Sequence, residues 1–131
     1  MMRDLFVYGT LRRETGSQMH DYLAANSTHL GEALFQGQLY RIEHFPGVVP
    51  SSDPSHQVVG DVFRLNDPTE MLDRLDAYEQ IGNGFSEPYE FERCEAVVAL
   101  RNGTRLPVWI YLYRWDVEGT EQILSGDFFS D

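Results

Sequence analysis

Leu5-Phe6-Val7-Tyr8-Gly9-Thr10-Leu11-Arg12 is the stretch of sequence that decides the fold. Its first four residues are apolar or aromatic, and so short a run predicts a strand that is buried on both faces. Gly9-Thr10 then predicts a turn that ends the strand. Glycine permits close approach of the backbone, and clustered N–H groups bind an anion without basic side chains. An ordinary break between a strand and a loop has the same pattern, so this stretch alone names no ligand.

Two further strands and a loop are expected in the middle of the chain. Apolar residues alternate over 32–42, which predicts a strand in which Gly37 marks a β-bulge. Residues 44–54 are rich in Pro, Gly, Ser and Asp, and we interpret them as a loop with a brief extended piece at Val48-Val49. The next strand is expected over 58–65.

One helix has the clearest start in the sequence. Asp67 stands at its cap, Pro68 at the first helical position and Glu70 three residues past the cap. This helix is expected to run to about residue 80, where glycines at 82 and 84 stop it.

A β-hairpin is predicted near the end of the chain. Arg101-Asn102-Gly103-Thr104 separates two apolar runs, 91–100 and 106–115, and Asn-Gly in this setting is a strong hairpin signal. Both faces of the second run are apolar or aromatic, so each face needs a covering helix or sheet wall. We therefore expect one domain over 1–131, a small, strongly curved mixed sheet or barrel that carries one or two helices, one of them capped by Ser17.

Composition argues against several kinds of partner. The chain has 131 residues, 42% of them hydrophobic, which can supply one sizeable core. A net charge of -11 repels phosphate backbones and anionic headgroups, so neither nucleic acid nor a membrane surface is an expected partner. The single cysteine, Cys94, excludes an internal disulfide, and no apolar run approaches the roughly 20 residues that cross a bilayer. A cytoplasmic location is the expectation.

No metal or cofactor is expected either. The histidines, His20, His29, His44 and His56, lack the paired spacing of metal ligands, and Gly9 is not part of a glycine-rich phosphate loop. We interpret each histidine as a surface or structural residue, and Cys94 as a small core residue on a strand.

Glu79 is the residue that looks out of place. At about 100° per residue it falls within the apolar arc of the helix that starts at Asp67, and Asp76 lies at the border of that arc. Of the acidic residues on this helix, only Glu79 is expected to point inward. Burial raises the pKa of a carboxyl group and so prepares it for proton transfer near neutral pH. The alternative is that Glu79 lies in a frayed last turn and reaches water. The same arc contains Met71, Leu72, Leu75 and Tyr78.

The quoted stretch also resembles a known family. Tyr8-Gly9-Thr10-Leu11-Arg12 after a strand is similar to the YG(S/T)L signature of the γ-glutamylcyclotransferase-like superfamily, which includes BtrG-like, AIG2-like and YtfP-like proteins. Phe91 departs from the family, which more often has tyrosine there, so no hydroxyl role is expected at that position. Further segments resemble the family's motifs in the same order, so that the likeness covers nearly the whole chain: Phe45–Pro50, Val59–Phe63, Leu75–Glu79, Phe91–Arg93, Trp109–Tyr113 and Ser125–Phe128, the last like the SGDW of YtfP-like members.

The resemblance implies a fold and a substrate-binding site. The fold is a six-stranded mixed β-barrel with short flanking helices, of the α+β class. The YG(S/T)L turn, here Tyr8, Gly9, Thr10 and Leu11, would receive a glutamyl carboxylate through backbone N–H groups. By the same motifs, Pro46, Gly47 and Tyr111 are candidate substrate contacts, although aromatic residues at period two, such as Tyr111, are often core residues.

The implied function is cyclisation of a γ-glutamyl group to 5-oxoproline, an acyl transfer within one molecule that releases an amine or an amino acid. The attacking amine belongs to the substrate, so the enzyme supplies no nucleophile, and Glu79 serves as general acid and base. Two alternatives stay open. One is a catalytically idle module of the same fold that binds γ-glutamyl or similar carboxylate ligands, and the other is an adaptor that uses its acidic surface. The leaving group and the oligomeric state have no signal in the sequence.

Overall fold

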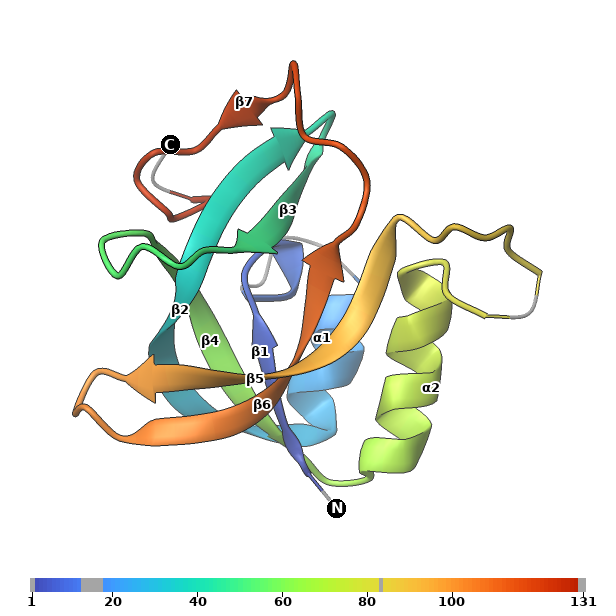
Figure 1. Cartoon of the computed structure of the whole chain (residues 1–131). Coiled ribbons are helices and arrows are strands. Elements are labelled where there is room, and N and C mark those ends of the chain that lie inside the picture. The colour runs from blue at the N-terminus through green and yellow to red at the C-terminus, as the bar shows by residue number, and fades with distance from the viewer. Residues whose placement is uncertain (1, 13–17, 83, 130–131) are drawn as a thin grey trace.

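A curved sheet of mixed strand direction forms the centre of the computed structural model, which describes residues 2–12, 18–82 and 84–129 (Figure 1). Two helices lie on one side of this sheet in the described chain. The elements in chain order are β1 (Asp4–Val7), a 3₁₀ turn η1 (Thr10–Arg12), α1 (Gln18–Ala25), β2 (Ser27–Ile42), β3 (Phe45–Pro50), β4 (Gln57–Leu65), α2 (Pro68–Tyr78), β5 (Phe91–Leu100), β6 (Arg105–Tyr113) and β7 (Glu121–Gln122).

The sheet closes on itself into a barrel. Its strands follow the order β3-β2-β4-β1-β6-β5, and an additional pairing of β2 with β5 closes the ring. The β1–β6 pair is parallel, whereas the other pairs are antiparallel. The predicted mixed barrel with flanking helices is thus confirmed, whereas the expected number of six strands in the barrel is wrong. In the described residues, five strands form the ring, while β3 and the two-residue β7 pair with β2 outside it.

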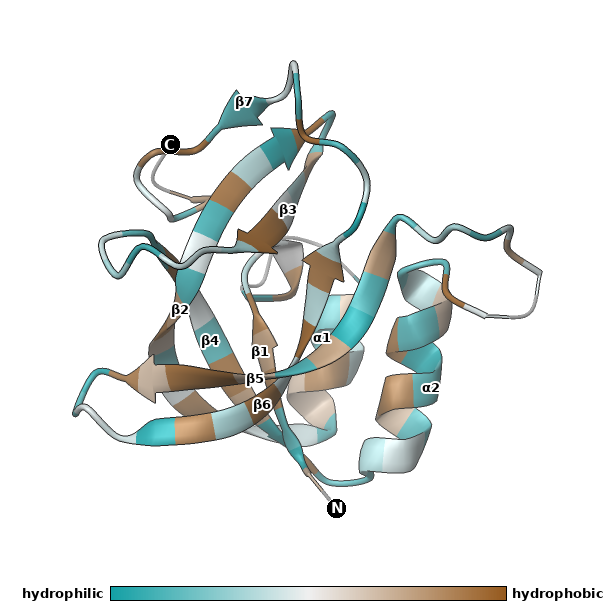
Figure 2. Cartoon of the chain, viewed as in Figure 1, coloured by the Kyte–Doolittle hydropathy of each residue, from teal (hydrophilic) through white to brown (hydrophobic). Residues whose placement is uncertain are grey.

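Burial on both faces of β1 explains its sequence. Leu5 and Val7 pack in the apolar layer between the barrel and the helices, and Phe6 and Tyr8 pack inside the barrel. Complete burial of one large apolar side chain stabilises a fold by about 1.5–3 kcal/mol. Because β1 buries side chains on both faces, it contributes to the barrel interior and to the layer beneath the helices. Along β2, by contrast, apolar and polar residues alternate over much of its length (Figure 2), as expected for a strand with one face in the core.

The middle of the chain differs from the sequence-based expectation. The segment interpreted as a loop contains β3, whose register with β2 runs unbroken from Ile42 opposite Phe45 to Gly37 opposite Pro50. Pairing with a long neighbouring strand outweighs a local composition that favours turns. The β-bulge predicted at Gly37 is wrong, because the register shift lies between His29 and Gly31. Gly31 has a φ of 138°, which side-chain-bearing residues rarely adopt.

Helix α2 begins as predicted. The side chain of Asp67 accepts a hydrogen bond from the Glu70 N–H at 3.2 Å, and Pro68 is the first helical residue. The helix packs on the barrel through Met71, Leu72 and Leu75, which are buried. Its apolar arc is narrower than expected, because Tyr78 is 46% exposed.

The C-terminal end of α2 is set by Gln80. Its N–H donates to the Ala77 carbonyl at 3.0 Å, and the Ile81 N–H donates to the Asp76 carbonyl at 2.8 Å. This pair of bonds is the Schellman motif, in which a left-handed residue reverses the chain, and Gln80 has a φ of 62°. The helix therefore ends at Tyr78, before the glycines that were expected to stop it.

The remaining predicted elements are confirmed. Strands β5 and β6 pair from Phe91 opposite Tyr113 to Ala99 opposite Arg105 and form the expected hairpin. The short first helix is α1, whereas its expected cap, Ser17, lies outside the described residues. Within the described chain, neither helix has the length and the apolar character needed to span a bilayer.

Candidate active site

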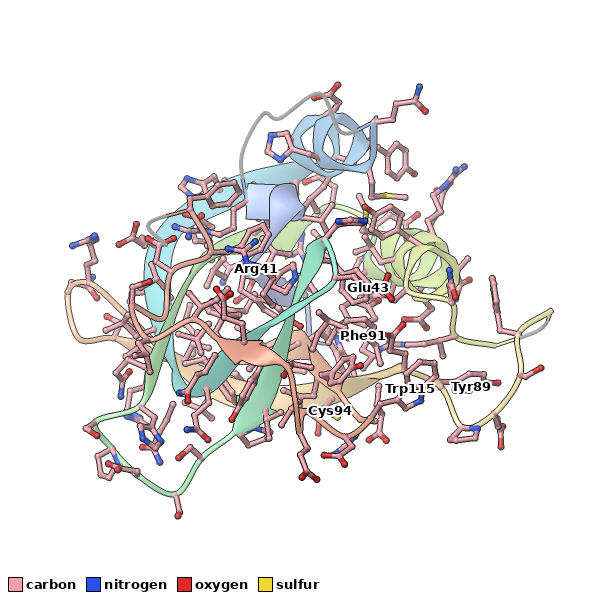
Figure 3. The ribbon with its side chains drawn as sticks, turned by 90° about the horizontal axis from the view of Figure 1, so that it is seen from above. Arg41, Glu43, Tyr89, Phe91, Cys94 and Trp115 are labelled. Carbon is pink, nitrogen blue, oxygen red and sulfur yellow. The ribbon has the colours of Figure 1, made fainter. Side chains whose placement is uncertain are left out.

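A cavity of about 230 Å³ opens where β1 leaves the barrel. Its wall is made by the end of β1 and the turn after it, by β3, by the C-terminal end of α2, by the start of β5 and by β6. Two of the described residues in this wall, Glu79 and Glu90, are acidic, and none is basic. Figure 3 shows two residues of this region from above, Phe91 and Glu43, near the C-terminal end of α2. The wall is lined by Phe6, Val7, Tyr8, Gly9, Leu11, Phe45, Pro46, Tyr78, Glu79, Gln80, Glu90, Phe91 and Tyr111.

Most of the residues expected at the site meet in this cavity. The residues that line it come from the turn after β1, η1, β3, the C-terminal end of α2 and β6, and they are Tyr8, Gly9, Leu11, Pro46, Glu79 and Tyr111. Thr10 belongs to η1, between Gly9 and Leu11. Gly47 is not in the described wall and lies against the ring of Tyr113 instead.

Glu79 is partly buried at the end of α2, with its side chain in the cavity wall. Its N–H donates to the Leu75 carbonyl at 2.9 Å, so the last turn is hydrogen-bonded and not frayed. Burial, and after it the negative charges of Glu90 and Asp76, raise the pKa of its carboxyl group from 4.5 to about 7. Near neutral pH the group therefore exists in both protonation states, as a proton-transferring residue requires.

The turn after β1 lines the same cavity as Glu79. Among the described residues, the Arg12 N–H donates to the Gly9 carbonyl at 2.9 Å, and no backbone carbonyl accepts from the N–H of Gly9 or Leu11. A Cβ atom on Gly9 would stand 2.7 Å from Cγ of Pro46, so only glycine allows the turn to approach β3 this closely. Free N–H groups at a tight turn offer a place for an anion.

Tyr8 contributes its ring to the cavity, while its hydroxyl is used within the fold. The hydroxyl donates to the backbone carbonyl of Tyr111 and accepts from the Val48 N–H, which ties β1 to β6 and β3. Burial, and then the charge of Glu79, raise the pKa of Tyr8 well above its ordinary value. The Tyr8 hydroxyl is thus a structural donor and remains protonated at neutral pH.

Asp76 is the residue that the sequence interpretation placed incorrectly. Its carboxylate accepts from the Tyr111 hydroxyl at 2.6 Å and from Nε and Nη2 of Arg93 at 2.8 and 3.1 Å. The Arg93 guanidinium lies over the Trp109 ring, 4.5 Å from its centroid. Glu79 is therefore not the only acid of α2 that faces the barrel, because paired hydrogen bonds compensate Asp76 for the loss of water. The bonds clamp the last turn of α2 onto β5 and β6, next to Glu79.

Glu90 and Phe91 were missed as cavity residues. Burial raises the pKa of the Glu90 carboxyl group, and so does the charge of Glu43, while a hydrogen bond from the Tyr113 hydroxyl lowers it. Phe91 packs between two rings, 5.8 Å from Phe45 and 5.4 Å from Tyr113 between centroids. Glu90 precedes its strand in a segment without periodicity, so no local pattern marks it. Phe91 matched a family motif, but a single strand residue does not reveal which cavity it lines.

In the described chain, neither a metal site nor the cysteine belongs to this cavity. The described residues contain no group of three or more His, Cys, Asp or Glu side chains that could hold a metal ion. Cys94 is partly buried at the edge of the barrel core, and it contacts the carboxylate of Glu92 and the guanidinium of Arg114. Burial raises the pKa of the Cys94 thiol, which makes it a weak nucleophile.

The fold and the site define a small mixed β-barrel protein in which a partly buried acid and a tight turn line one cavity. A family model described as "Gamma-glutamyl cyclotransferase, AIG2-like" matches residues 5–130. The gamma-glutamylcyclotransferase family protein YtfP of Escherichia coli K12 is 31% identical over 125 residues, which are 95% of this chain and 94% of that protein. The chain belongs to this gamma-glutamylcyclotransferase, AIG2-like family.

Solved structures share the architecture. The solution structure of ytfP from Escherichia coli superimposes with a TM-score of 0.62 at 31% identity and covers 95% of each chain. The crystal structure of YkqA from Bacillus subtilis has a TM-score of 0.74 at 24% identity, and the match covers 99% of this chain and 40% of that one. The second likeness is one of fold alone.

Proposed function

We propose that this protein cyclises the γ-glutamyl group of a small substrate to 5-oxoproline and releases an amine or an amino acid. The observation that carries the proposal is the position of Glu79, a carboxyl group with a pKa of about 7 in the wall of the cavity. Membership of the γ-glutamylcyclotransferase family supports the same reaction class.

The substrate carboxylate is proposed to bind the backbone N–H groups at Gly9, Thr10 and Leu11. Such groups bind an anion without a basic side chain, which suits a wall that has none among its described residues. The ring of Tyr8 and the Pro46 side chain would flank the glutamyl methylene groups in the apolar part of the wall. Gly47 acts behind this wall, against Tyr113, and not by contact.

The chemical step needs only a proton carrier. The α-nitrogen of the glutamyl group forms a bond to its own side-chain carbonyl carbon, and the bond from that carbon to the leaving nitrogen breaks. Glu79 takes the proton that the α-nitrogen loses and returns it to the leaving nitrogen, so atoms and charge balance. Proton transfer by a positioned group contributes about 10²- to 10⁴-fold in rate. Tyr111 acts through Asp76 by holding the last turn of α2 in place.

The proposal is tested by incubating the protein with γ-glutamyl amines, γ-glutamyl amino acids and glutathione, and by measuring 5-oxoproline. Wild type releases it from at least one compound, and Glu79→Gln lowers kcat by about 10²- to 10⁴-fold. Glu70→Gln, an exposed acid on the same helix, keeps wild-type activity and serves as the matched control.

Two results would contradict the proposal. Release of 5-oxoproline from none of the compounds leaves the idle binding module, which binds such ligands without turnover. Equal activity of Glu79→Gln and wild type removes Glu79 from the reaction.

A further inference from the structure

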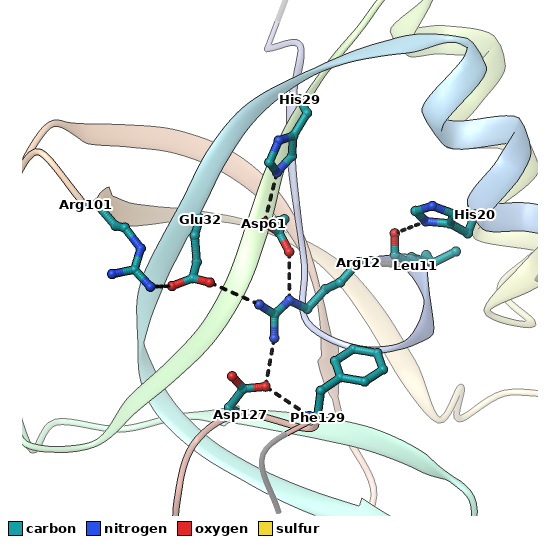
Figure 4. A network of polar contacts seen from close by, with 9 residues as sticks. All are labelled: Leu11, Arg12, His20, His29, Glu32, Asp61, Arg101, Asp127 and Phe129. Carbon is teal, nitrogen blue, oxygen red and sulfur yellow. Dashed lines mark hydrogen bonds and ion pairs between the residues drawn. The ribbon is translucent and has the colours of Figure 1, made fainter. Parts of the chain in front are cut away.

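Arg12 is buried behind the turn that follows β1, and its guanidinium holds three carboxylates at once (Figure 4). Nε donates to Asp61 at 2.8 Å, Nη1 to Asp127 at 2.9 Å, and Nη2 lies 3.5 Å from Glu32. Only 1% of the Arg12 side chain is exposed. Each of the three guanidinium nitrogens thus serves a different carboxylate.

These carboxylates come from three distant parts of the chain. Glu32 lies on β2, Asp61 on β4 and Asp127 in the segment after β7, and none of them lines the cavity in the described wall. The Arg12 side chain and its three partners therefore lie outside the described cavity wall. Its effect reaches the cavity only through the backbone of residues 9–12.

The turn is held from behind at two further points. The Arg12 N–H donates to the Gly9 carbonyl at 2.9 Å, and Nδ1 of His20, on α1, lies 2.7 Å from the Leu11 carbonyl. Gly9 and Leu11 themselves line the cavity. The side chain of Arg12 thus anchors the rear of a turn whose front faces the proposed carboxylate site.

The C-terminal segment that supplies Asp127 packs closely on β4. Gly126 has a φ of 72°, and its carbonyl accepts from the Val59 N–H at 2.7 Å. A Cβ atom on Gly126 would stand 1.9 Å from the Gln57 carbonyl oxygen, so only glycine fits there. This close docking explains the Ser-Gly-Asp-Phe motif at residues 125–128, for which the sequence offered no role.

We infer that Arg12, held by Asp127, is a positioning residue that orients the N–H groups of residues 9–11 toward the substrate carboxylate. The C-terminal segment Ser125–Phe129, which we term the C-terminal latch, is then part of the binding machinery although it lies outside the cavity. The inference rests on the proposed role of the turn in binding a γ-glutamyl substrate.

The chemistry of guanidinium makes Arg12 specific for this role. Lysine carries the same charge on one nitrogen, so it cannot hold three carboxylates that approach from different directions. Loss of the cation would also remove the positive charge that the three carboxylates share, and so leave more negative charge behind a turn that must accept an anion. Both effects weaken carboxylate binding and leave the proton transfer by Glu79 unaltered.

The test compares Arg12→Lys and Asp127→Asn with wild type in two assays. The first titrates L-5-oxoproline, the probe for the carboxylate site, and follows the amide NMR signals of Gly9 and Leu11. The second measures KM and kcat for a γ-glutamyl substrate. We expect both variants to raise the dissociation constant and KM by about tenfold or more, as for a lost charge-assisted contact, with kcat within a few-fold of wild type and an unchanged pH profile.

Arg101→Gln is the matched control. Arg101 also pairs with Glu32, but its side chain is 78% exposed and it does not touch the turn, so this change leaves KM at its wild-type value. A merely structural role for Arg12 lowers the melting temperature without moving KM, and that result overturns the inference. A decrease of KM in Asp127→Asn also overturns it, because through-space repulsion would then outweigh positioning.

The outcome is separable from that of the proposed function. If wild type binds L-5-oxoproline but forms no 5-oxoproline from any γ-glutamyl substrate, the enzyme proposal fails. The binding assay then still decides the role of Arg12. If wild type is active while both variants keep wild-type KM and 5-oxoproline affinity, only the role of Arg12 falls. If Arg12→Lys does not fold, Asp127→Asn, which leaves Arg12 paired with Asp61, carries the test. Both proposals are contradicted if wild type neither binds L-5-oxoproline nor turns over any γ-glutamyl substrate.

Discussion

The proton affinity of Glu79 depends on a small number of neighbouring residues. Burial is the largest cause of its raised pKa, followed by the charges of Glu90 and Asp76. Asp76 is held by Tyr111 and Arg93, so its charge is fixed in place beside the carboxyl group of Glu79. The position of Glu79 on an apolar arc was readable from the sequence, whereas Glu90 was not, because it reaches the cavity only after the chain has returned from α2.

Glu90→Gln is expected to move the pH dependence of activity. Removal of its negative charge lowers the pKa of Glu79, so the acid limb of kcat/KM, which falls below about pH 7 in wild type, moves to lower pH. The limb stays above pH 4.5 because burial, the larger cause, persists. Glu92→Gln, an exposed acid two residues further on that pairs with Arg114, leaves the profile unchanged. An acid limb that does not move in Glu90→Gln would show that Glu90 and Glu79 are not coupled.

Among the elements, the end of α2 determines where Glu79 lies. The Schellman motif turns the chain back at Gln80, and the bonds from Asp76 to β5 and β6 hold the last turn against the barrel. The start of this helix was predicted from Asp67, Pro68 and Glu70, because capping depends on neighbouring residues alone. Its end was misplaced because glutamine is an uncommon residue for a left-handed position.

Gln80→Gly is expected to stabilise the protein by about 0.5–1 kcal/mol. Glycine adopts the φ of 62° without the strain of a side chain, and this gain exceeds its larger entropy in the unfolded chain. Gln80→Val has the opposite effect, because a β-branched residue fits a left-handed position poorly. Urea denaturation of the three proteins measures the difference. A less stable Gln80→Gly protein would mean that the glutamine side chain makes a compensating contact.

At the scale of the whole molecule, the cavity lies where the closed barrel ring meets β3 and the C-terminal end of α2. Strand β1 joins the barrel interior to the helical layer, and the turn after it meets α1, β3 and the C-terminal latch. Placing a carboxyl group in this junction lowers stability, because the folded state favours the protonated form. The proton transfer proposed for Glu79 requires this cost, and lower stability is a common consequence of functional groups.

Glu79→Gln is expected to be more stable than wild type at pH 8. A carboxyl whose folded-state pKa is raised from 4.5 to about 7 binds protons more tightly when folded, so wild type gains stability as the pH falls through 7 toward 4.5. Above pH 7 its charge costs about 1–3 kcal/mol, which glutamine avoids. Denaturation at pH 8 and pH 4 measures this difference, and Glu70→Gln is the control. An equal advantage at both pH values would contradict the linkage.

The sequence by itself determined the features that depend on residues close together in the chain. These include the strand and turn at 5–12, the cap of α2 and the hairpin around Asn102-Gly103. Each is a local pattern whose energetics involve a few neighbouring residues, so it can be predicted without knowledge of the tertiary structure. The position of Glu79 on an apolar arc belongs to the same class.

Only the tertiary structure decided the contacts that barrel closure creates. The conversion of an expected loop into β3, the meeting of Arg12 with Asp127, and the bond from Tyr111 to Asp76 join residues far apart in the chain. Strand order and register determine which side chains meet across such a separation, and local periodicity carries no information about either. The charged residues behind the turn and beside Glu79 therefore become visible only when the barrel is folded.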